Sequence, residues 1–369
     1  MLRVKAFFPY IVVGLVVLVV APIAYKSLKQ SVAVPSKPII LSGGEIGQRI
    51  AQFVERTQRP DGSFYVAYEC LTRGTPCTPL ENPRIWNAGQ AIVALSLAGR
   101  KDSADKAMRF SLPRCKNDST CDFIALDLYY QETGDDRYRA ALEIAGKDAL
   151  AIVSSAHTLE DYVRLSQKNI PEKLARMYEL TKDVRYRDAL KKIGESALRE
   201  IDFANSQEAM AAGQYGLYSN SAILSSKALI YVFKATGDTK YRDAYKSFFD
   251  TSKIASGVYA LMEPPYFLYE AVSASAEGLA YLSTTEANPA DATRYRDDAR
   301  LIVQTIVAWG FDGTERPLWD GGNNLLARSG ATPNRSDTMD VKYKATNENG
   351  RIVRLLLTYF KDTSFSLSL

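Results

Sequence analysis

The chain has 369 residues and a net charge of +4, with 46% hydrophobic and 24% charged residues. This balance supports a large folded core and excludes a disordered chain. The positive charges are spread along the sequence, without a basic block or an aromatic-basic stripe, so nucleic acid is not expected as a partner.

The N-terminal region carries an uncharged apolar run, AFFPYIVVGLVVLVVAPIAY, over residues 6–25. A helix of this length spans roughly 30 Å, about the hydrocarbon thickness of a bilayer. A cleaved signal peptide is the alternative, but its apolar region is usually about 7–15 residues long and ends at a small-residue cleavage site. We therefore expect a transmembrane anchor over 1–28, a linker over 29–44 and a folded domain over 45–369.

The four cysteines form two close pairs, in CLTRGTPC and CKNDSTC. Local pairing would join Cys70 to Cys77 and Cys115 to Cys121 in disulfides, although other pairings are possible. Zinc, whose cysteine ligands are usually spaced more closely, and free thiols are the alternatives. Disulfides form in oxidising compartments. We therefore expect a single-pass membrane protein whose globular domain lies outside the cytoplasm.

A nine-residue pattern, TGDTKYRDA at 236–244, recurs along the chain. The related copies are TGDDRYRAA (133–141), TKDVRYRDA (181–189) and DATRYRDDA (291–299). Apolar positions on both sides recur every three or four residues, so both flanking segments are predicted to be helices. Gly237 suits the left-handed position after a helix, and Asp238 suits the N-cap of the next helix. The pattern therefore predicts the tight turn of a helical hairpin, which is scaffold, rather than an active-site signature.

The hairpins repeat with a period near 50 residues. The first helices of the hairpins are predicted at 86–98, 121–133, 161–181, 219–236, 266–284 and 349–361. The second helices are predicted at 45–58, 103–111, 136–153, 184–202, 239–251 and 292–309. The first and last segments are complementary halves of one hairpin, and the first helices are the less charged set, as an inner ring would be. These features predict a closed all-α ring of six hairpins without regular strands.

This plan resembles the six-hairpin (α/α)6-toroid superfamily, which includes glycoside hydrolases, polysaccharide lyases, sugar epimerases and terpenoid cyclases. The segment QRPDGSF (58–64) resembles a Q-x-x-D-G-S-F/W turn common in that superfamily. The resemblance implies that Asp61 is a turn residue. The D-x-D-D acid motif of the cyclases is absent from the sequence, which disfavours terpene chemistry.

The long loops that lead into the first helices contain the candidate catalytic residues. Glycoside hydrolysis needs a carboxylic acid and a second carboxylate. The candidates are Glu263, Glu270, Asp320 and Asp122. Burial at the start of an apolar helix would raise the pKa of Glu270, although a structural buried glutamate is the alternative. Asp122 could instead cap the helix that follows it. The candidate sugar-binding side chains are Trp86, Trp319, Tyr218, Tyr266 and Asn220.

The leading hypothesis is a membrane-anchored, extracytoplasmic glycoside hydrolase that acts on a polysaccharide or glycan. A non-catalytic toroid that binds cell-surface glycan or a protein partner is the second hypothesis. A lyase or epimerase that uses tyrosine or His157 is the third, although a histidine in that position also suits a surface loop. No cofactor or metal is expected, because a sequence with one histidine cannot form an HExxH site and contains no phosphate-binding loop.

Overall fold

The computed structural model describes residues 39–65, 67–70, 78–79, 88–117, 120–166, 168–204, 215–252, 269–310 and 342–367. The chain divides into the unit Leu41–Phe365 and a smaller unit made of Met1–Ile40 and Ser366–Leu369. The predicted membrane anchor over 1–28 lies outside the described residues. No helix in the described part of the chain has the length and apolar character needed to cross a membrane. The described helices all lie in the unit Leu41–Phe365.

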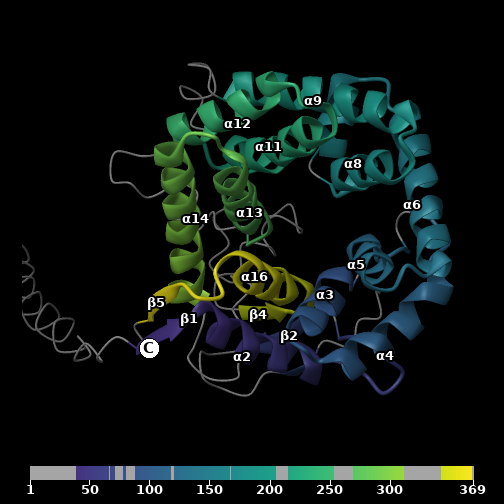
Figure 1. The fold of residues 1–369 in the computed structure, drawn as a ribbon, viewed down its shortest axis with the longest axis vertical. Coiled ribbons are helices and arrows are strands. Elements are labelled where there is room, and N and C mark those ends of the chain that lie inside the picture. Colours follow the sequence, from purple (N-terminus) through teal and green to yellow (C-terminus); the bar gives the residue numbers. More distant parts are fainter. Residues whose placement is uncertain are drawn as a thin grey trace, which may run out of the picture. The chain divides into compact units, whose positions relative to one another are not determined.

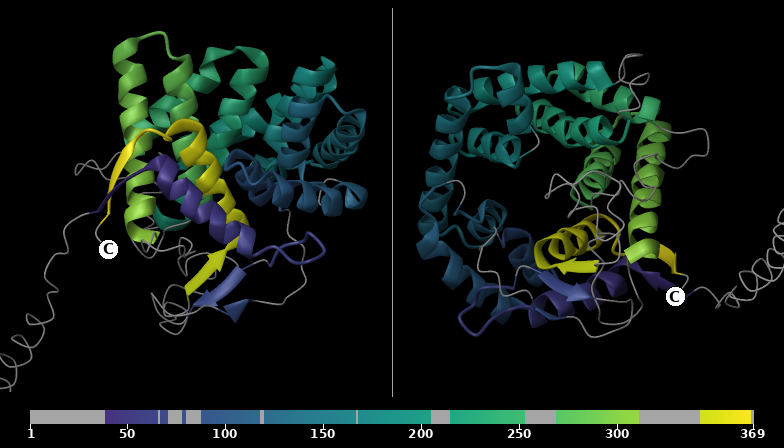
Figure 2. Two further views of the ribbon diagram at one scale, coloured as in Figure 1. Left: turned by 60° about the horizontal axis from the view of Figure 1, so that its bottom comes forward. Right: turned by 180° about the vertical axis from the view of Figure 1, so that it is seen from behind.

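Helices of this unit alternate along the chain between an inner and an outer layer (Figures 1 and 2). The inner helices are α3 (Gly89–Leu97), α5 (Phe123–Thr133), α8 (Ile170–Thr181), α11 (Tyr215–Thr236), α13 (Tyr269–Thr285) and α16 (Thr346–Tyr359). The outer helices are α2 (Gly43–Arg56), α4 (Lys101–Ser111), α6 (Asp136–Ser154), α9 (Val184–Ala204), α12 (Thr239–Ser252) and α14 (Pro289–Gly310). Every predicted helix has a counterpart here.

Contacts among the inner helices close the ring. The helices α8, α11, α13, α16, α3 and α5 contact one another in that order, and α6 packs on both α5 and α8. The first outer helix, α2, packs on α16, the last inner helix, as expected for two halves of one hairpin. Gly350 permits a close approach of α16 to α3, since a Cβ there would lie 2.6 Å from the carbonyl oxygen of Gln90. The closed ring of hairpins is confirmed.

The third inner segment differs from its prediction. Instead of one helix over 161–181, the chain forms α7 (Leu159–Ser166) and then α8. Pro171 lies in the first turn of α8, where the missing N–H of proline does no harm. In the middle of a continuous helix the same proline would remove a hydrogen bond and clash with the preceding turn, so the helix divides before it.

Short strands in the connections also depart from the all-helical prediction. The strand β2 (Ala67–Cys70) pairs antiparallel with β3 (Thr78–Pro79) and with β4 (Lys342–Ala345). Because β4 leads directly into α16, this sheet joins the first long loop to the last. A second pair, β1 (Ile39–Ser42) with β5 (Ser364–Leu367), also forms. Strands this short show no clear period-two pattern in the sequence.

The repeated turns have the predicted geometry. Gly237 has a φ of +69°, and its N–H donates to the Phe233 carbonyl oxygen at 2.8 Å. Asp238 accepts a hydrogen bond from the Lys240 backbone N–H at 3.1 Å. The Tyr241 side chain is buried, and its hydroxyl donates to Glu195 Oε1 at 2.6 Å. These contacts confirm that the repeated pattern is scaffold.

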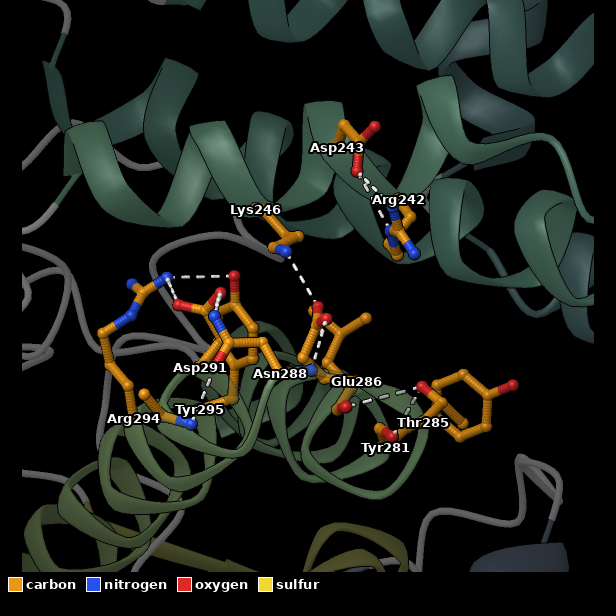
Figure 3. A network of polar contacts seen from close by, with 12 residues as sticks. Arg242, Asp243, Lys246, Tyr281, Thr285, Glu286, Asn288, Asp291, Arg294 and Tyr295 are labelled. Carbon is orange, nitrogen blue, oxygen red and sulfur yellow. Dashed lines mark hydrogen bonds and ion pairs between the residues drawn. The ribbon is translucent and has the colours of Figure 1, made fainter.

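The next hairpin is fastened to the ring at this same end. Figure 3 shows Lys246 of α12 reaching Glu286, which lies between α13 and α14, with Nζ and Oε2 2.8 Å apart. The Arg294 guanidinium donates to the hydroxyl of Tyr295 at 3.0 Å, and the Tyr295 side chain is fully buried.

The helix α14 begins one turn earlier than predicted, because Asn288 caps it by accepting the Ala290 N–H at 3.0 Å.

The QRPDGSF turn is also structural. Asp61 accepts hydrogen bonds from the Ser63 backbone N–H at 3.0 Å and from the Ser63 hydroxyl at 2.7 Å. These hydrogen bonds lower the pKa of Asp61, which does not suit a catalytic acid. Gln58 Nε2 donates to the Ser103 carbonyl oxygen of α4 at 2.8 Å. The turn thus joins α2 to α4, and the implied role of Asp61 as a turn residue is confirmed.

Candidate functional site

Polar side chains line one face of several inner helices, at spacings of three and four residues that keep them on the same side of a helix. Contacts and charge interactions between helices show that these faces meet inside the ring. We call the following side chains the inner-helix cluster: Glu172 on α8; Lys227, Tyr231 and Lys234 on α11; Glu277 and Tyr281 on α13; Arg351 and Arg354 on α16.

Glu277 is the best-connected carboxylate of the inner-helix cluster. Its Oε2 accepts a hydrogen bond from Arg354 at 2.6 Å, and the two side chains are only 22% and 18% exposed. Burial raises the pKa of Glu277, but the positive charges of Arg354 and the lysines and arginine beside it outweigh burial and hold that pKa below its usual value. Glu277 is therefore held as an anion surrounded by cations from two neighbouring helices.

The lysines of the cluster come from α11. The Lys234 ammonium lies 3.8 Å from the centre of the Tyr281 ring and 5.3 Å from that of Tyr231, which are cation–π distances. Burial lowers the pKa of Lys234, although Glu277 opposes this effect. Lys227 donates to Asn169 Oδ1, just before α8, at 3.1 Å. Burial also keeps the pKa of Tyr231 well above its ordinary value, so this phenol stays neutral.

A further ion pair joins α5 to α8. Arg176 Nε lies 2.7 Å from Asp127 Oδ1, and Arg176 also reaches Glu179 at 2.9 Å. Burial raises the pKa of Asp127 despite this partner. The pair connects two inner helices whose direct contact is sparse compared with the rest of the ring.

Asp122 is the candidate catalytic residue whose side chain is described. It occupies the N-cap position of α5, and its carbonyl oxygen accepts the Leu126 N–H at 3.0 Å, but its side chain makes no capping hydrogen bond to that helix. Its Oδ2 accepts a hydrogen bond from the hydroxyl of Ser111, at the end of α4. Burial raises the pKa of Asp122, although the Ser111 hydroxyl, the N–H groups of Ala88 and Gly89 and the charge of Lys173 oppose the shift.

The position of Asp122 suits an acid. It is 7% exposed and faces the amino end of α3, at the end of the ring where the inner helices begin and opposite the repeated turns. A carboxyl group that keeps its proton to a higher pH than usual can protonate a leaving group. Within one ring, the pKa of Asp122 is thus raised and the pKa of Glu277 is lowered.

The structure locates other predicted residues only in part. Glu270 lies in the first turn of α13, and Tyr218 and Asn220 lie near the start of α11; the orientations of these side chains are not described. All three belong to inner helices at the same end of the ring as Asp122. The remaining candidate catalytic and sugar-binding residues lie outside the described residues: Glu263, Asp320, Trp86, Trp319 and Tyr266.

The structure tests part of the predictions for the cysteines and for His157. Cys115 and Cys121 form a disulfide, the local pairing of that segment. Cys70 ends β2, and Cys77 lies outside the described residues. His157 is exposed, and its backbone N–H donates to Asp161 Oδ2 at 3.1 Å, as expected for a surface loop.

Sequence reasoning missed the inner-helix cluster. Its signal was the presence of charges within helices that are otherwise small and apolar: Lys227 in SSKALIYVF, Glu277 in SASAEGLAY and the arginines of RIVRLLL. A charge in such a setting must lie against a partner or face a polar interior.

Comparisons with known proteins identify the fold. Neither a family model nor a curated protein matches the sequence. The unsaturated glucuronyl hydrolase of Bacillus sp. GL1, described as responsible for the degradation of glycosaminoglycan, matches with a TM-score of 0.60 and 12% identity, over 87% of this chain and 99% of that one. A variant of the unsaturated glucuronyl hydrolase of Streptococcus agalactiae matches with a TM-score of 0.54 and 13% identity, over 88% and 93%.

These neighbours have an (α/α)6 toroid, and the chain has the six-hairpin toroid fold that its repeats predict. At such identities the likeness shows the fold alone. Among the residues that the structure describes, no group of His, Cys, Asp and Glu side chains is placed to hold a metal ion. What the described part of the ring offers is a charged and aromatic interior together with a buried acid.

Proposed function

We propose that this chain is a carbohydrate-active protein of the hydrolase type. The observation that carries the proposal is the polar interior of the ring, where charged and tyrosine side chains from four inner helices converge. Sugars bind to such surfaces through hydrogen bonds to charged groups and through contacts with aromatic rings, whereas an apolar ligand requires an apolar pocket. The fold shared with two glucuronyl hydrolases supports the same conclusion.

We further propose that the glycan carries acidic groups. The cations of the inner-helix cluster, Lys227, Lys234, Arg351 and Arg354, outnumber its two carboxylates, Glu172 and Glu277. Arginine and lysine in a partly desolvated setting favour carboxylate and sulfate groups. The Bacillus neighbour is described as acting in glycosaminoglycan degradation, which is chemistry of the same class.

In the proposed reaction, Asp122 protonates the leaving oxygen of the glycosidic bond. Its burial and raised pKa suit this role. The second carboxylate comes from Glu270, Glu263 or Asp320, of which Glu270 lies at the same end of the ring. Burial of this site excludes water and keeps the Asp122 carboxyl protonated to a higher pH than usual.

We also propose that the protein is anchored in a membrane, with the toroid outside the cytoplasm. The apolar run at 6–25 supports the anchor. The disulfide between Cys115 and Cys121 supports an oxidising compartment.

The test uses the purified full-length chain in detergent and matched neutral and acidic oligosaccharides, including unsaturated uronates. New reducing ends report hydrolysis; absorbance of the unsaturated uronate rises for a lyase and falls when an unsaturated sugar is consumed. We expect new reducing ends from acidic oligosaccharides only. A rise in absorbance would instead support the lyase hypothesis.

The role of Asp122 is tested by Asp122→Asn, which we expect to lower kcat at least about 100-fold with little change in KM. In the unmodified protein, activity falls as pH rises through the raised pKa of Asp122, because the ionised group has no proton to give. Asp61→Asn, at an exposed turn, is the control and keeps its activity. Full activity of Asp122→Asn would rule out this acid.

A non-catalytic glycan-binding toroid is the second candidate function. The observation in its favour is that Glu277 is held ionised by its cationic neighbours, which suits binding better than proton donation. A rise in melting temperature with acidic oligosaccharides, with no product of any kind, would support it.

A further inference from the structure

The connection between α4 and α5 carries both Asp122 and a crosslink. It passes through the short 3-10 helix η1 (Leu112–Arg114) and then through the segment closed by the disulfide between Cys115 and Cys121. Cys121 is fully buried, and Asp122 follows it directly. The crosslink therefore lies between the end of α4 and the candidate acid.

The hydrogen bond that holds Asp122 closes the same loop just outside the disulfide. Its partners, Ser111 and Asp122, are 11 positions apart in sequence, whereas the disulfide spans a separation of 6 within that interval. Bringing the ends of a loop together costs conformational entropy that rises with loop length. Because the disulfide already holds Cys115 and Cys121 together, only the few residues outside it must be ordered to form the hydrogen bond. The entropic cost of that hydrogen bond is therefore lower.

Other hydrogen bonds among the described residues of the loop centre on Asn117 and Thr120, and the Thr120 hydroxyl accepts the N–H groups of Lys116 and Asn117 at 3.0 and 3.1 Å. The Thr120 backbone N–H donates to Asn117 Oδ1 at 3.1 Å, and the Cys121 N–H donates to the Asn117 carbonyl oxygen at 3.1 Å. Both Asn117 and Thr120 are exposed, so water competes for these groups. These exposed hydrogen bonds alone restrain the Asp122 carboxyl poorly, because burial disfavours its charged form.

We infer that the disulfide is a positioning device for Asp122: it holds the carboxyl against Ser111 and the amino end of α3, and without it the carboxyl turns toward solvent. This inference deepens the proposed function, since it gives Cys115 and Cys121 a role in the site beyond general stability. The positioning itself is a property of the free protein and does not depend on which glycan is bound.

The first test measures the pKa of Asp122 by carbon-13 NMR of aspartate carboxyl groups in the full chain without glycan, with Asp122→Asn to assign the signal. In the double variant Cys115→Ser/Cys121→Ser we expect the pKa to fall toward the ordinary value of about 3.9. The matched control is Asp135→Ala, which removes the cap of α6 and leaves the crosslink in place. A folded double variant that keeps the raised pKa would overturn the inference.

A second variant decides the question if the double variant does not fold. Ser111→Ala removes the hydrogen bond but keeps the disulfide. If the crosslink holds the carboxyl in place, the pKa of Asp122 stays raised, because the lost hydrogen bond had opposed the shift. A fall of the pKa to the ordinary value in Ser111→Ala would show that the hydrogen bond is the restraint, and the inference would be wrong.

These readouts separate the inference from the proposed function. A negative glycan assay leaves the NMR result valid, and an unchanged pKa in the double variant leaves the glycan assay valid. If the chain hydrolyses glycan, the double variant should show a lower kcat, an unchanged KM and a loss of activity that begins at lower pH. A disulfide with a merely structural role would leave the pH profile unmoved.

Discussion

The repeated turns and the interior of the ring carry ion pairs of opposite character. At the repeated turns, Arg137 pairs with Asp135 at 2.6 Å, with 74% of the arginine side chain exposed. Within the ring, Arg354 pairs with Glu277 at the same distance, with 18% exposed. The turn pair recurs as Arg185 with Asp183 at the same distance. In this chain, repetition marks the scaffold, and side chains that break the repeat mark the candidate site.

The largest expected effect tests this contrast directly. Arg354→Met leaves Glu277 among fewer cations in a partly buried setting, and we expect it to lower the free energy of unfolding by about 3 kcal/mol. Arg137→Met removes an exposed partner whose attraction water screens, so we expect a much smaller loss of unfolding free energy. Urea unfolding of both variants measures the difference. Equal losses of unfolding free energy would show that the turn pair and the inner pair are not energetically distinct.

The second prediction concerns the turn that joins α2 to α4. Gly62 has a φ of +95°, and a Cβ there would lie 2.5 Å from the Lys106 carbonyl oxygen. We expect Gly62→Ala to cost about 2–3 kcal/mol, because backbone strain and a clash with main-chain atoms combine. Gly99→Ala has a similar φ of +76° but meets no atom within 4 Å, so it isolates the strain, about 1 kcal/mol. Thermal unfolding of the two variants measures both losses of stability, and the difference between them is the cost of the clash at Gly62. Identical losses in melting temperature would show that the clash costs nothing.

A smaller effect is expected for the tyrosine of the repeated turn. Tyr241→Phe removes the hydrogen bond to Glu195 and should lower stability by about 1 kcal/mol, since the acceptor is a carboxylate in a half-buried position. Tyr186→Phe, at the corresponding position of the preceding turn, is the control and should cost less. If Tyr186→Phe is the more damaging change, the hydroxyl of Tyr241 is not a fastening of the scaffold.

The smallest effect is a gain. Lys182 has a φ of +58°, at the position where the equivalent turns have Gly134 and Gly237. We expect Lys182→Gly to raise the free energy of unfolding by roughly 0.5 kcal/mol, because relief of the left-handed strain exceeds the extra chain entropy of glycine. Lys168→Gly, outside the turn, should bring no gain. A loss of stability in Lys182→Gly would mean that the lysine side chain contributes more than its backbone strain costs.

Local sequence rules predicted the scaffold well, because the residues that end and begin helices act through their nearest neighbours in the chain. A glycine followed by aspartate between two amphipathic segments can end one helix and cap the next, as in the copies at 133–141 and 236–244, and the spacing of the related copies sets the repeat. The predicted helix over 161–181 takes no account of Pro171, although the sequence shows it, so the division of α7 from α8 was missed. Strands of two to four residues form through pairing between distant loops, which no local pattern encodes.

The candidate site could be predicted only in part. Asp122 was identified by its place before an inner helix, but its partner Ser111 comes from the previous helix and had no sequence signal. The inner-helix cluster requires that α11, α13 and α16 face one another, and only closure of the ring brings Lys234, Glu277 and Arg354 together. Interactions of this kind depend on the three-dimensional arrangement, so spacing along the chain cannot reveal them.

Closure of the ring by α2 and α16 has a consequence for how the protein is made. The apolar side of α2, with Ile46, Ile50 and Val54, is synthesised long before α16, on which the helix packs. Translation proceeds at roughly 5–20 residues per second, so these side chains wait many seconds for that partner to leave the ribosome. Five hairpins can form in sequence during this time, while the seam between the first and last helices stays open. The nascent chain therefore exposes the apolar face of α2, and a chaperone that binds this face would protect it until synthesis is complete.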